Sequence, residues 1–454
     1  MGRKYDFDYI VIGSGPAGRA AALNLAKKKK KVAIVEGNVF GGADLATRDL
    51  PYAVNSNFAK TFLKIKNFPA TATSDFHFNF PTLISHQNYV TSLAINEEKN
   101  LFAEKNITIL SGHAHFLDKN TIAINTNRFT AKNFIIATGS KLKTGEISGL
   151  DSVNYLTPET ALKLPRLPKC AIIVGGGSTG CEIASYYAAL GVKVIILERG
   201  NRILLEEDKE VSVAITEHFT SDLGIMVIPN ARVVALEQDS LSKRVIFVSN
   251  GQEKLVRVDC IVLATGSEPS LDLGLENAGV KYKRSGILVD KLFETTTDNI
   301  YAIGDCINRE NSSTELSEYE AMLLTSNILN KTKASPNYTG FIREVNTPLA
   351  VATVGANERD LITRDKKCKK SIIYLKDLPA GDIENKSSGF VKIFAKDNRI
   401  IGATIVAENA GLLIEELALA IRQRLSLNSI VGTPHLKNSD NLAIQIAVRK
   451  LTEK

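Results

Sequence analysis

Two stretches of the 454-residue chain repeat the same order of elements. The first, residues 5–37, is YDFDYIVIGSGPAGRAAALNLAKKKKKVAIVEG, and the second, residues 170–200, is CAIIVGGGSTGCEIASYYAALGVKVIILERG. Each pattern indicates an apolar strand, a glycine-rich turn, an amphipathic helix, a second apolar strand and a terminal acidic residue. Units of this kind build parallel sheets covered by helices, so the chain is predicted to contain two α/β domains.

The turn of the first unit has the spacing of a dinucleotide-binding loop. Its first glycine makes the tight turn, its second lets a pyrophosphate approach the backbone, and its third packs helix on strand. The helix that follows presents free N–H groups to the phosphates. Glu36 ends the next strand, where its carboxylate can accept a ribose hydroxyl. The residues of this turn are Gly13, Ser14, Gly15, Pro16, Ala17 and Gly18.

The second unit predicts a second nucleotide site, with Glu198 as its acidic residue. A carboxylate at this position suits the free 2′-hydroxyl of NAD and would repel the 2′-phosphate of NADP. Arg199 and Arg202 follow closely, and either could reach a phosphate or lie in a solvated loop. We therefore expect NADH to be preferred over NADPH. The turn residues are Gly175, Gly177, Ser178, Thr179 and Gly180.

The last part of the chain has a different pattern. After about residue 340 the glycine-rich signals stop, TPLAVATVG and GFVKIFA read as strands, and NAGLLIEELALAIRQR reads as an amphipathic helix. This indicates a separate α+β domain. Before it, FIIATGS at 134–140, CIVLATGS at 260–267 and NIYAIGDC at 299–306 read as further strands of the two α/β domains.

Charge and apolar patterning narrow the class of protein. The net charge is +7, without a basic face interleaved with aromatic residues, so nucleic-acid binding is not expected. No signal peptide precedes the first strand and no apolar run reaches spanning length, so we expect a cytoplasmic protein without a membrane span. Five scattered cysteines have no metal spacing and suggest reduced thiols, with Cys368 expected at the surface.

Together these motifs resemble the pyridine nucleotide-disulfide oxidoreductases, the group of dihydrolipoamide dehydrogenase, glutathione reductase and mercuric reductase. The resemblance covers essentially the whole chain. It implies two Rossmann-like domains, for FAD and NAD, and a C-terminal α+β dimerisation domain that makes a homodimer. The implied segments are 1–150 and 271–340 for the FAD domain, 151–270 for the NAD(P) domain, and 341–454 for the dimerisation domain.

The resemblance also assigns cofactor residues. It implies that Asp305 binds the ribityl–pyrophosphate part of FAD and that the backbone of Ala114 lies near the adenine. Further positions assigned to the two nucleotides are Gly42, Ala43, Ala137, Thr138, Gly139, Glu182, Gly266 and Gly304. His113 and His115 share one face of a short strand, which favours packing or surface roles over a metal site. No metal site is expected.

The chain departs from the family where the chemistry takes place. The two redox cysteine positions hold Asp44 and Asp49, and the family lysine near the flavin corresponds to Ala53. In the C-terminal motif, HLKNSD, His435 is retained and Asp440 takes the position of the family glutamate. These four polar residues, Asp44, Asp49, His435 and Asp440, are the catalytic candidates.

Each candidate has a structural alternative. Asp44 could cap a helix that begins near Thr47, and Asp49 could be what remains of a lost disulfide. Asp49 corresponds to a position beside the flavin ring, where a neutral acid could give a proton to an acceptor. His435 and Asp440 could be a second acid–base pair or a hydrogen bond at the dimer interface.

Without a thiolate the chain cannot carry out dithiol–disulfide exchange, whereas hydride transfer from nicotinamide to flavin needs no cysteine. The leading hypothesis is therefore a homodimeric FAD enzyme that oxidises NADH and reduces a small, non-disulfide electron acceptor, quinone-like in character. The first alternative is a flavoprotein resembling the soluble transhydrogenases, although Glu198 argues mildly against NADPH. The second is a degenerate FAD-binding scaffold, which the loss of lysine at Ala53 favours and the intact nucleotide motifs disfavour.

Overall fold

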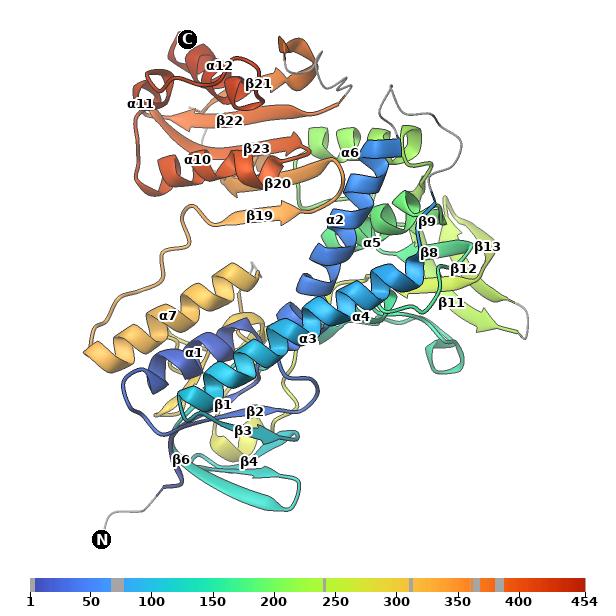
Figure 1. Ribbon diagram of the computed structural model, residues 1–454. Coiled ribbons are helices and arrows are strands. Elements are labelled where there is room, and N and C mark those ends of the chain that lie inside the picture. The colour runs from blue at the N-terminus through green and yellow to red at the C-terminus, as the bar shows by residue number, and fades with distance from the viewer. Residues whose placement is uncertain are drawn as a thin grey trace. The chain divides into compact units, whose positions relative to one another are not determined.

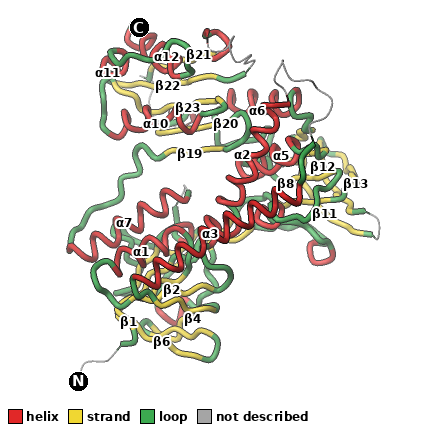
Figure 2. The backbone as a smooth tube through the Cα atoms, viewed as in Figure 1, coloured by secondary structure: helices red, strands yellow, loops and turns green. Residues whose placement is uncertain are grey.

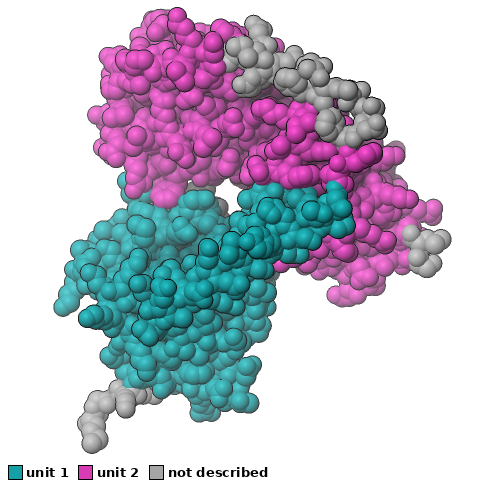
Figure 3. Space-filling view, in the orientation of Figure 1, with its two compact units in different colours: residues 1–55, 79–143, 266–337 teal, residues 56–78, 144–265, 338–454 magenta. Residues whose placement is uncertain are grey.

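The computed structural model describes residues 5–66, 77–239, 242–309, 313–359, 361, 368–379 and 388–453. Two compact units, coloured separately in Figure 3, make up the chain. Unit 1 comprises residues 1–55, 79–143 and 266–337, and unit 2 comprises residues 56–78, 144–265 and 338–454. None of the helices in the described residues is both long and apolar enough to cross a membrane.

Unit 1 is built on a seven-stranded sheet with the order β3-β2-β1-β6-β5-β4, and β18 adds to β6. Strands β3, β2, β1, β6 and β18 pair in parallel, whereas β5 and β4 pair antiparallel. The central strand is buried on both faces because helices cover the sheet, and Ile10 and Val11 are inaccessible. The strands are β1 (Phe7–Ile12), β2 (Val32–Glu36), β3 (Thr108–Ser111), β4 (Ala114–Asp118), β5 (Thr121–Ile124), β6 (Asn127–Ile136) and β18 (Ile300–Ala302).

The helices of unit 1 include a closely packed pair, α1 (Pro16–Ala26) and α7 (Thr314–Asn330), which lie side by side in Figure 1. Helix α3 (Phe80–Glu104) is the longest, and α2 (Asp49–Lys66) begins in unit 1 and ends in unit 2. The short elements are η1 (Ala43–Thr47), β7 (Ser140–Leu142), β15 (Ser267–Pro269), η3 (Leu275–Ala278), β16 (Tyr282–Lys283), β17 (Gly286–Ile287) and η4 (Gly304–Cys306).

Unit 2 contains a second parallel sheet, ordered β10-β9-β8-β14, and a three-stranded antiparallel sheet, β11-β12-β13. The parallel sheet falls within residues 170–263, the range of the second repeated sequence unit and the strand that follows it. Its elements and their neighbours are η2 (Leu150–Ser152), α4 (Pro158–Ala161), β8 (Cys170–Val174), α5 (Ser178–Ala189), β9 (Lys193–Leu197), α6 (Lys209–Ser221), β10 (Met226–Ile228), β11 (Ala231–Gln238), β12 (Lys243–Ser249), β13 (Gln252–Val258) and β14 (Cys260–Leu263).

The C-terminal part of unit 2 is a five-stranded antiparallel sheet, β19-β20-β23-β22-β21, with helix α10 packed on it, as Figure 2 shows. The predicted fold class is therefore confirmed: two Rossmann-like sheets and a C-terminal α+β part. Its elements are β19 (Ile342–Val345), β20 (Ala350–Gly355), β21 (Lys369–Tyr374), η5 (Leu375–Asp377), β22 (Phe390–Lys396), β23 (Arg399–Ala407), α10 (Ala410–Arg422), α11 (Leu427–Val431) and α12 (Asn441–Thr452).

A buried lysine joins parts of unit 2 that are far apart in the sequence. Lys392 on β22 is fully inaccessible, and its Nζ lies 2.9 Å from Asp208 Oδ2, 3.2 Å from Glu210 Oε2 and 2.9 Å from Glu358 Oε2. Carboxylates on three sides offset the desolvation of the ammonium group. This cluster fixes the start of α6 against the antiparallel sheet.

Candidate functional site

The first glycine-rich turn has the geometry that its sequence predicts. Gly13 has a φ of +106°, and a Cβ there would lie 2.2 Å from the Ala137 carbonyl oxygen. A Cβ on Gly18 would lie 1.9 Å from the carbonyl oxygen of Gly13, whereas one on Gly15 would meet no atom within 4 Å. Two glycines are therefore required by close backbone packing, and Gly15 leaves an open side at the start of α1.

Glu36 lies beside this turn at the end of β2, as predicted. Its Oε2 accepts hydrogen bonds from the backbone N–H and the hydroxyl of Ser14, at 3.0 and 2.6 Å, and its Oε1 accepts from Asn38 N at 2.8 Å. These bonds fix the carboxylate next to the start of α1, which is where a dinucleotide ribose lies in a fold of this type.

The loop that contains Gly41 and Gly42 packs against the first glycine-rich turn. Gly42 has a φ of +62°, and a Cβ there would lie 2.8 Å from Gly15 Cα. Arg19, on α1, donates to the carbonyl oxygens of Ser14 and Gly41 at 3.0 and 2.8 Å. The buried guanidinium of Arg19 thus ties this loop to the dinucleotide turn.

Asp44 is the ion-pair partner of the same arginine. Arg19 Nη2 lies 2.5 Å from Asp44 Oδ2, and Arg19 Nε lies 3.3 Å from Glu98 Oε1 on α3. The structural alternative for Asp44, a cap on a helix beginning near Thr47, does not hold, because residues 43–47 form a π-helical turn and α2 begins at Asp49. The sequence reasoning missed Arg19, although an arginine directly after the third glycine of the turn was a visible signal.

Asp49, the first residue of α2, connects two neighbouring segments of unit 1. Its Oδ1 lies 2.7 Å from Arg48 Nε, and its Oδ2 accepts a hydrogen bond from the Thr314 hydroxyl at 2.7 Å. The Asp49 side chain is 34% exposed. One of these partners, Thr314, is the first residue of α7.

Several of the remaining positions assigned to FAD directly follow strands β6 and β18. Asp305 Oδ1 lies 2.9 Å from Arg309 Nη2, and Gly304 donates its N–H to Glu320 Oε2 at 2.8 Å. Arg309 also pairs with the fully buried Glu320 at 2.5 Å. Thr138 donates its hydroxyl to the Ser270 carbonyl at 2.8 Å. The other assigned positions in this unit are Ala114 and Ala137, both buried, and Gly139 and Gly266, which have positive φ.

The two histidines before and on β4 contact different glycines. A Cβ on Gly37 would lie 2.4 Å from His113 Nδ1, and a Cβ on Gly274 would lie 2.4 Å from His115 Nε2. Each ring therefore packs against a backbone segment that has no side chain of its own. Within the described residues no group of three potential metal ligands occurs.

The second glycine-rich turn repeats the geometry of the first. Gly175 has a φ of +110°, and a Cβ there would lie 2.3 Å from the Ala264 carbonyl oxygen. A Cβ on Gly180 would lie 2.0 Å from the Gly175 carbonyl oxygen, and one on Gly177 would meet nothing within 4 Å. Helix α5 begins directly after this open glycine, at Ser178, with Thr179 next. The two turns are therefore equivalent in packing as well as in sequence.

Glu198 lies at the second turn as Glu36 does at the first. Its Oε2 accepts from Gly176 N at 2.7 Å and its Oε1 accepts from Gly200 N at 2.5 Å. Arg202 uses its guanidinium internally and donates to the carbonyl oxygens of Leu204, Leu205 and Glu207. Arg199 is exposed. Of the two arginines that could have reached a 2′-phosphate, one is occupied in holding its own loop.

The C-terminal histidine has a carboxylate partner that the sequence did not predict. His435 Nε2 lies 3.1 and 3.2 Å from the two carboxylate oxygens of Glu416 on α10, and its Nδ1 lies 2.8 Å from the Thr433 carbonyl oxygen. Asp440, proposed as the acid of this pair, is the N-cap residue of α12. Sequence reasoning missed Glu416 because it lies 19 residues before the histidine.

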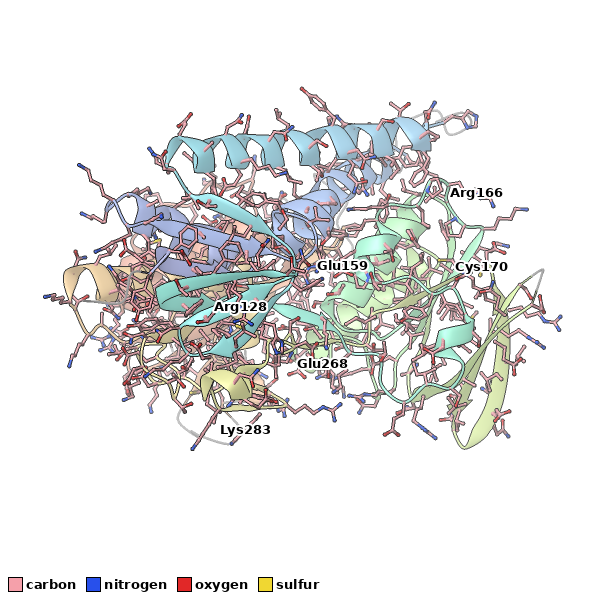
Figure 4. All side chains as sticks on the ribbon, turned by 90° about the horizontal axis from the view of Figure 1, so that it is seen from below. Arg128, Glu159, Arg166, Cys170, Glu268 and Lys283 are labelled. Carbon is pink, nitrogen blue, oxygen red and sulfur yellow. The ribbon has the colours of Figure 1, made fainter. Side chains whose placement is uncertain are left out.

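All five cysteines are free thiols. Burial raises the pKa of Cys260 and Cys306 to about 11 and raises the pKa of Cys181 well above its ordinary value. Burial also raises the pKa of Cys170, which begins β8 and is labelled in Figure 4. Cys368, expected at the surface, is partly buried. Because the thiolate is the reactive form, the four thiols whose pKa is raised are poor nucleophiles: Cys170, Cys181, Cys260 and Cys306.

Comparison with known proteins places the chain in a family. Residues 7–323 match the Pyridine nucleotide-disulphide oxidoreductase family, and residues 343–438 match the dimerisation domain of that family. A mercuric reductase of Bacillus cereus is 30% identical over 451 residues, which cover 97% of this chain and 71% of the relative. A dihydrolipoyl dehydrogenase of Staphylococcus aureus is 30% identical over 441 residues, 94% of this chain and 93% of the relative.

Solved structures show the same fold. The flavoprotein disulfide reductase RclA from Escherichia coli has a TM-score of 0.87 and 23% identity, over 98% of this chain and 99% of its own. LpdA from Mycobacterium tuberculosis has a TM-score of 0.87 and 22% identity, with the same coverage.

The residues of the first turn fit FAD. The open side at Gly15, the free N–H groups at the start of α1 and the fixed carboxylate of Glu36 are features that would suit a pyrophosphate and its adenosine ribose. The second turn offers the same features for a nicotinamide nucleotide. On this geometry and on both sequence matches, the chain belongs to the pyridine nucleotide-disulphide oxidoreductases, FAD-dependent oxidoreductases that act with NAD(P)H.

Proposed function

We propose that this protein is a homodimeric FAD enzyme that takes hydride from NADH and passes the electrons to a non-disulfide acceptor, quinone-like in character. The observation that carries the proposal is the pair Asp44 and Asp49, in the stretch where the resemblance places the redox cysteines. The match to the family's dimerisation domain supports the homodimer.

The two carboxylates argue against a disulfide substrate. Dithiol–disulfide exchange begins with the attack of a thiolate, and a carboxylate cannot be oxidised reversibly to a crosslink. Asp44 is held by Arg19, and Asp49 by Arg48 and Thr314, so both are built into the local structure. The raised thiol pKa values of the buried cysteines argue against one of them acting instead.

Two features of unit 2 support NADH as the donor. The Glu198 carboxylate is fixed by two backbone N–H groups, where it can bind a ribose 2′-hydroxyl and would repel a 2′-phosphate. The Arg202 guanidinium is directed to three carbonyl oxygens of its own loop. The balance between the carboxylate and the exposed Arg199 then favours NADH.

FAD, when bound, would supply hydride chemistry toward NADH and one- or two-electron transfer to an acceptor. A quinone that receives two electrons also needs two protons to become a hydroquinone. One of these protons accompanies the electrons in the hydride equivalent from NADH. We propose that Asp49, protonated from solvent, delivers the other, with Thr314 as its hydrogen-bond partner. A one-electron acceptor such as ferricyanide needs no proton.

The test is anaerobic mixing of the holoprotein with NADH, followed by single additions of a quinone or ferricyanide, in wild type and Asp49→Asn. NADH should bleach the flavin in both proteins. The variant should lose about 10²-fold in quinone reduction, the low end for a positioned general acid, and keep ferricyanide reduction. Equal loss with both acceptors would show that Asp49 acts on the flavin or the fold. Reduction of oxidised lipoamide or glutathione by wild type would overturn the non-disulfide assignment.

A further inference from the structure

A half-buried lysine lies next to the predicted nicotinamide nucleotide site of unit 2. Lys60, on α2, donates from its Nζ to the side-chain oxygen of Asn346, directly after β19. Asn346 in turn donates its backbone N–H to Glu182 Oε1 at 2.9 Å. Hydrogen bonds thus connect Lys60 through Asn346 to a carboxylate on α5.

The environment of Lys60 is acidic as well as half-buried. Burial lowers the pKa of Lys60, and the carboxylates of Glu344, Glu182 and Glu408 act in the opposite direction. These glutamates come from β19, from α5 and from the segment before α10, and Glu408 also pairs with Lys64. Within this group, Glu182 is the carboxylate that accepts from Asn346, the hydrogen-bond partner of Lys60.

The position of Glu182 suggests which part of the nucleotide it meets. Helix α5 begins at Ser178, after the open glycine that would accept the pyrophosphate, and Glu182 is four residues further along the same helix. The adenosine end of the nucleotide belongs at Glu198, whose carboxylate lies at the turn. This leaves the nicotinamide half as the part of NADH that Glu182 would contact.

We propose that Lys60 is a positioning residue for NADH: through Asn346 it holds the Glu182 carboxylate in place for the nicotinamide half of the nucleotide. This inference rests on the proposed function, because it assumes that unit 2 binds NADH. Lys60 is seven residues after Ala53, the position of the family lysine, so the pairing seen here was not evident from the sequence.

The experiment compares two non-reacting nucleotides by calorimetry on the FAD-loaded protein. NAD⁺ contains the nicotinamide half, and ADP-ribose lacks the nicotinamide. In Lys60→Met the dissociation constant for NAD⁺ should rise about tenfold, as expected for the loss of one charge-assisted hydrogen bond, and that for ADP-ribose should not change. Lys60→Arg should recover most of the NAD⁺ affinity.

Lys64→Met is the matched control. Lys64 lies one turn further along α2, is 68% exposed and pairs with Glu408 at 3.2 Å, so its loss should leave both affinities unchanged. Asn346→Ser removes the side-chain amide that accepts from Lys60 Nζ, and it should reproduce the Lys60→Met pattern. It serves as the second test if Lys60→Met does not fold. Equal weakening of both nucleotides, or no weakening of NAD⁺, would overturn the role of Lys60. If the wild-type protein binds neither nucleotide and NADH does not bleach its flavin, the proposed function itself fails.

Discussion

The ion pair between Arg19 and Asp44 leads to a prediction whose size follows from its burial. Asp44→Ala removes the partner 2.5 Å from a guanidinium that is 8% exposed. Breaking a buried pair from one side costs about 3–5 kcal/mol, because the remaining charge stays desolvated. Glu98 remains 3.3 Å from Arg19 Nε, so we expect the low end, about 3 kcal/mol. Asp44→Asn keeps an acceptor oxygen and should cost about 1–2 kcal/mol.

This cost should appear as weaker retention of FAD. Arg19 also donates to the Ser14 and Gly41 carbonyl oxygens, so the dinucleotide turn and the loop above it depend on its position. The assay is flavin fluorescence released during a urea titration of the holoprotein. The midpoint should fall in the order wild type, Asp44→Asn, Asp44→Ala. Arg19→Met should lower the midpoint at least as far as Asp44→Ala, because it removes the bonds to Ser14 and Gly41 as well.

Asp49→Ala is the matched control, because Asp49 is also an aspartate paired with an arginine. The side chains of Asp49 and Arg48 are 34% and 37% exposed, and an exposed pair is worth about 1 kcal/mol or less. If Asp44→Ala releases flavin no earlier than Asp49→Ala, the buried pair does not stabilise this site.

Three further predictions follow from the glycine turns, the second acid and the buried lysine. Gly18→Ala should prevent correct folding, because its Cβ would meet a carbonyl oxygen at 1.9 Å. Gly15→Ala should fold and lose FAD. Circular dichroism reports the folding of each variant, and flavin absorbance reports its FAD content. Glu198→Gln should reduce the preference for NADH over NADPH in flavin bleaching, since the repulsion of a 2′-phosphate is removed. Burial opposes the charge of Lys392, but its carboxylate partners raise the pKa of Lys392 above its ordinary value. For Glu358, burial acts to raise the pKa, but the neighbouring ammonium groups of Lys370 and Lys392 lower it below its ordinary value. The contribution of Lys392 to stability is complete below its ordinary pKa and is lost as pH rises through the raised value. That of Glu358 is complete above its ordinary pKa and is lost as pH falls through the lowered value. The difference in melting temperature between wild type and Lys392→Met should therefore be largest near neutral pH and shrink at both extremes.

The parts of the site that sequence predicted are those in which local backbone geometry selects the residue. Gly13 and Gly175 need a positive φ and a close carbonyl, so their spacing is visible in the sequence. Glu36 and Glu198 follow from the length of a strand–helix–strand unit, which brings the end of the second strand to the turn. The apolar runs of these units likewise predicted the two parallel sheets.

The contacts that sequence could not predict join side chains distant along the chain. Arg19 reaches Glu98, His435 reaches Glu416, and Lys60 reaches Asn346, and nothing in the local pattern marks these partners. Such pairs depend on how packed elements approach one another. The π-helical turn at 43–47 likewise contains Asp44, whose partner Arg19 lies on a separate helix, α1.

Arg19 and Arg48, the partners of Asp44 and Asp49, would also affect cysteines introduced at positions 44 and 49. Cysteines introduced at positions 44 and 49 would leave Arg19 buried with Glu98 as its carboxylate partner and would remove the Arg48 partner as well. A nearby guanidinium would also favour thiolates over thiols, in a stretch wound as a π-helical turn. Changing the two aspartates to cysteines therefore also changes the partners of both arginines. Each aspartate that is replaced by cysteine leaves its arginine, Arg19 or Arg48, with one carboxylate partner fewer.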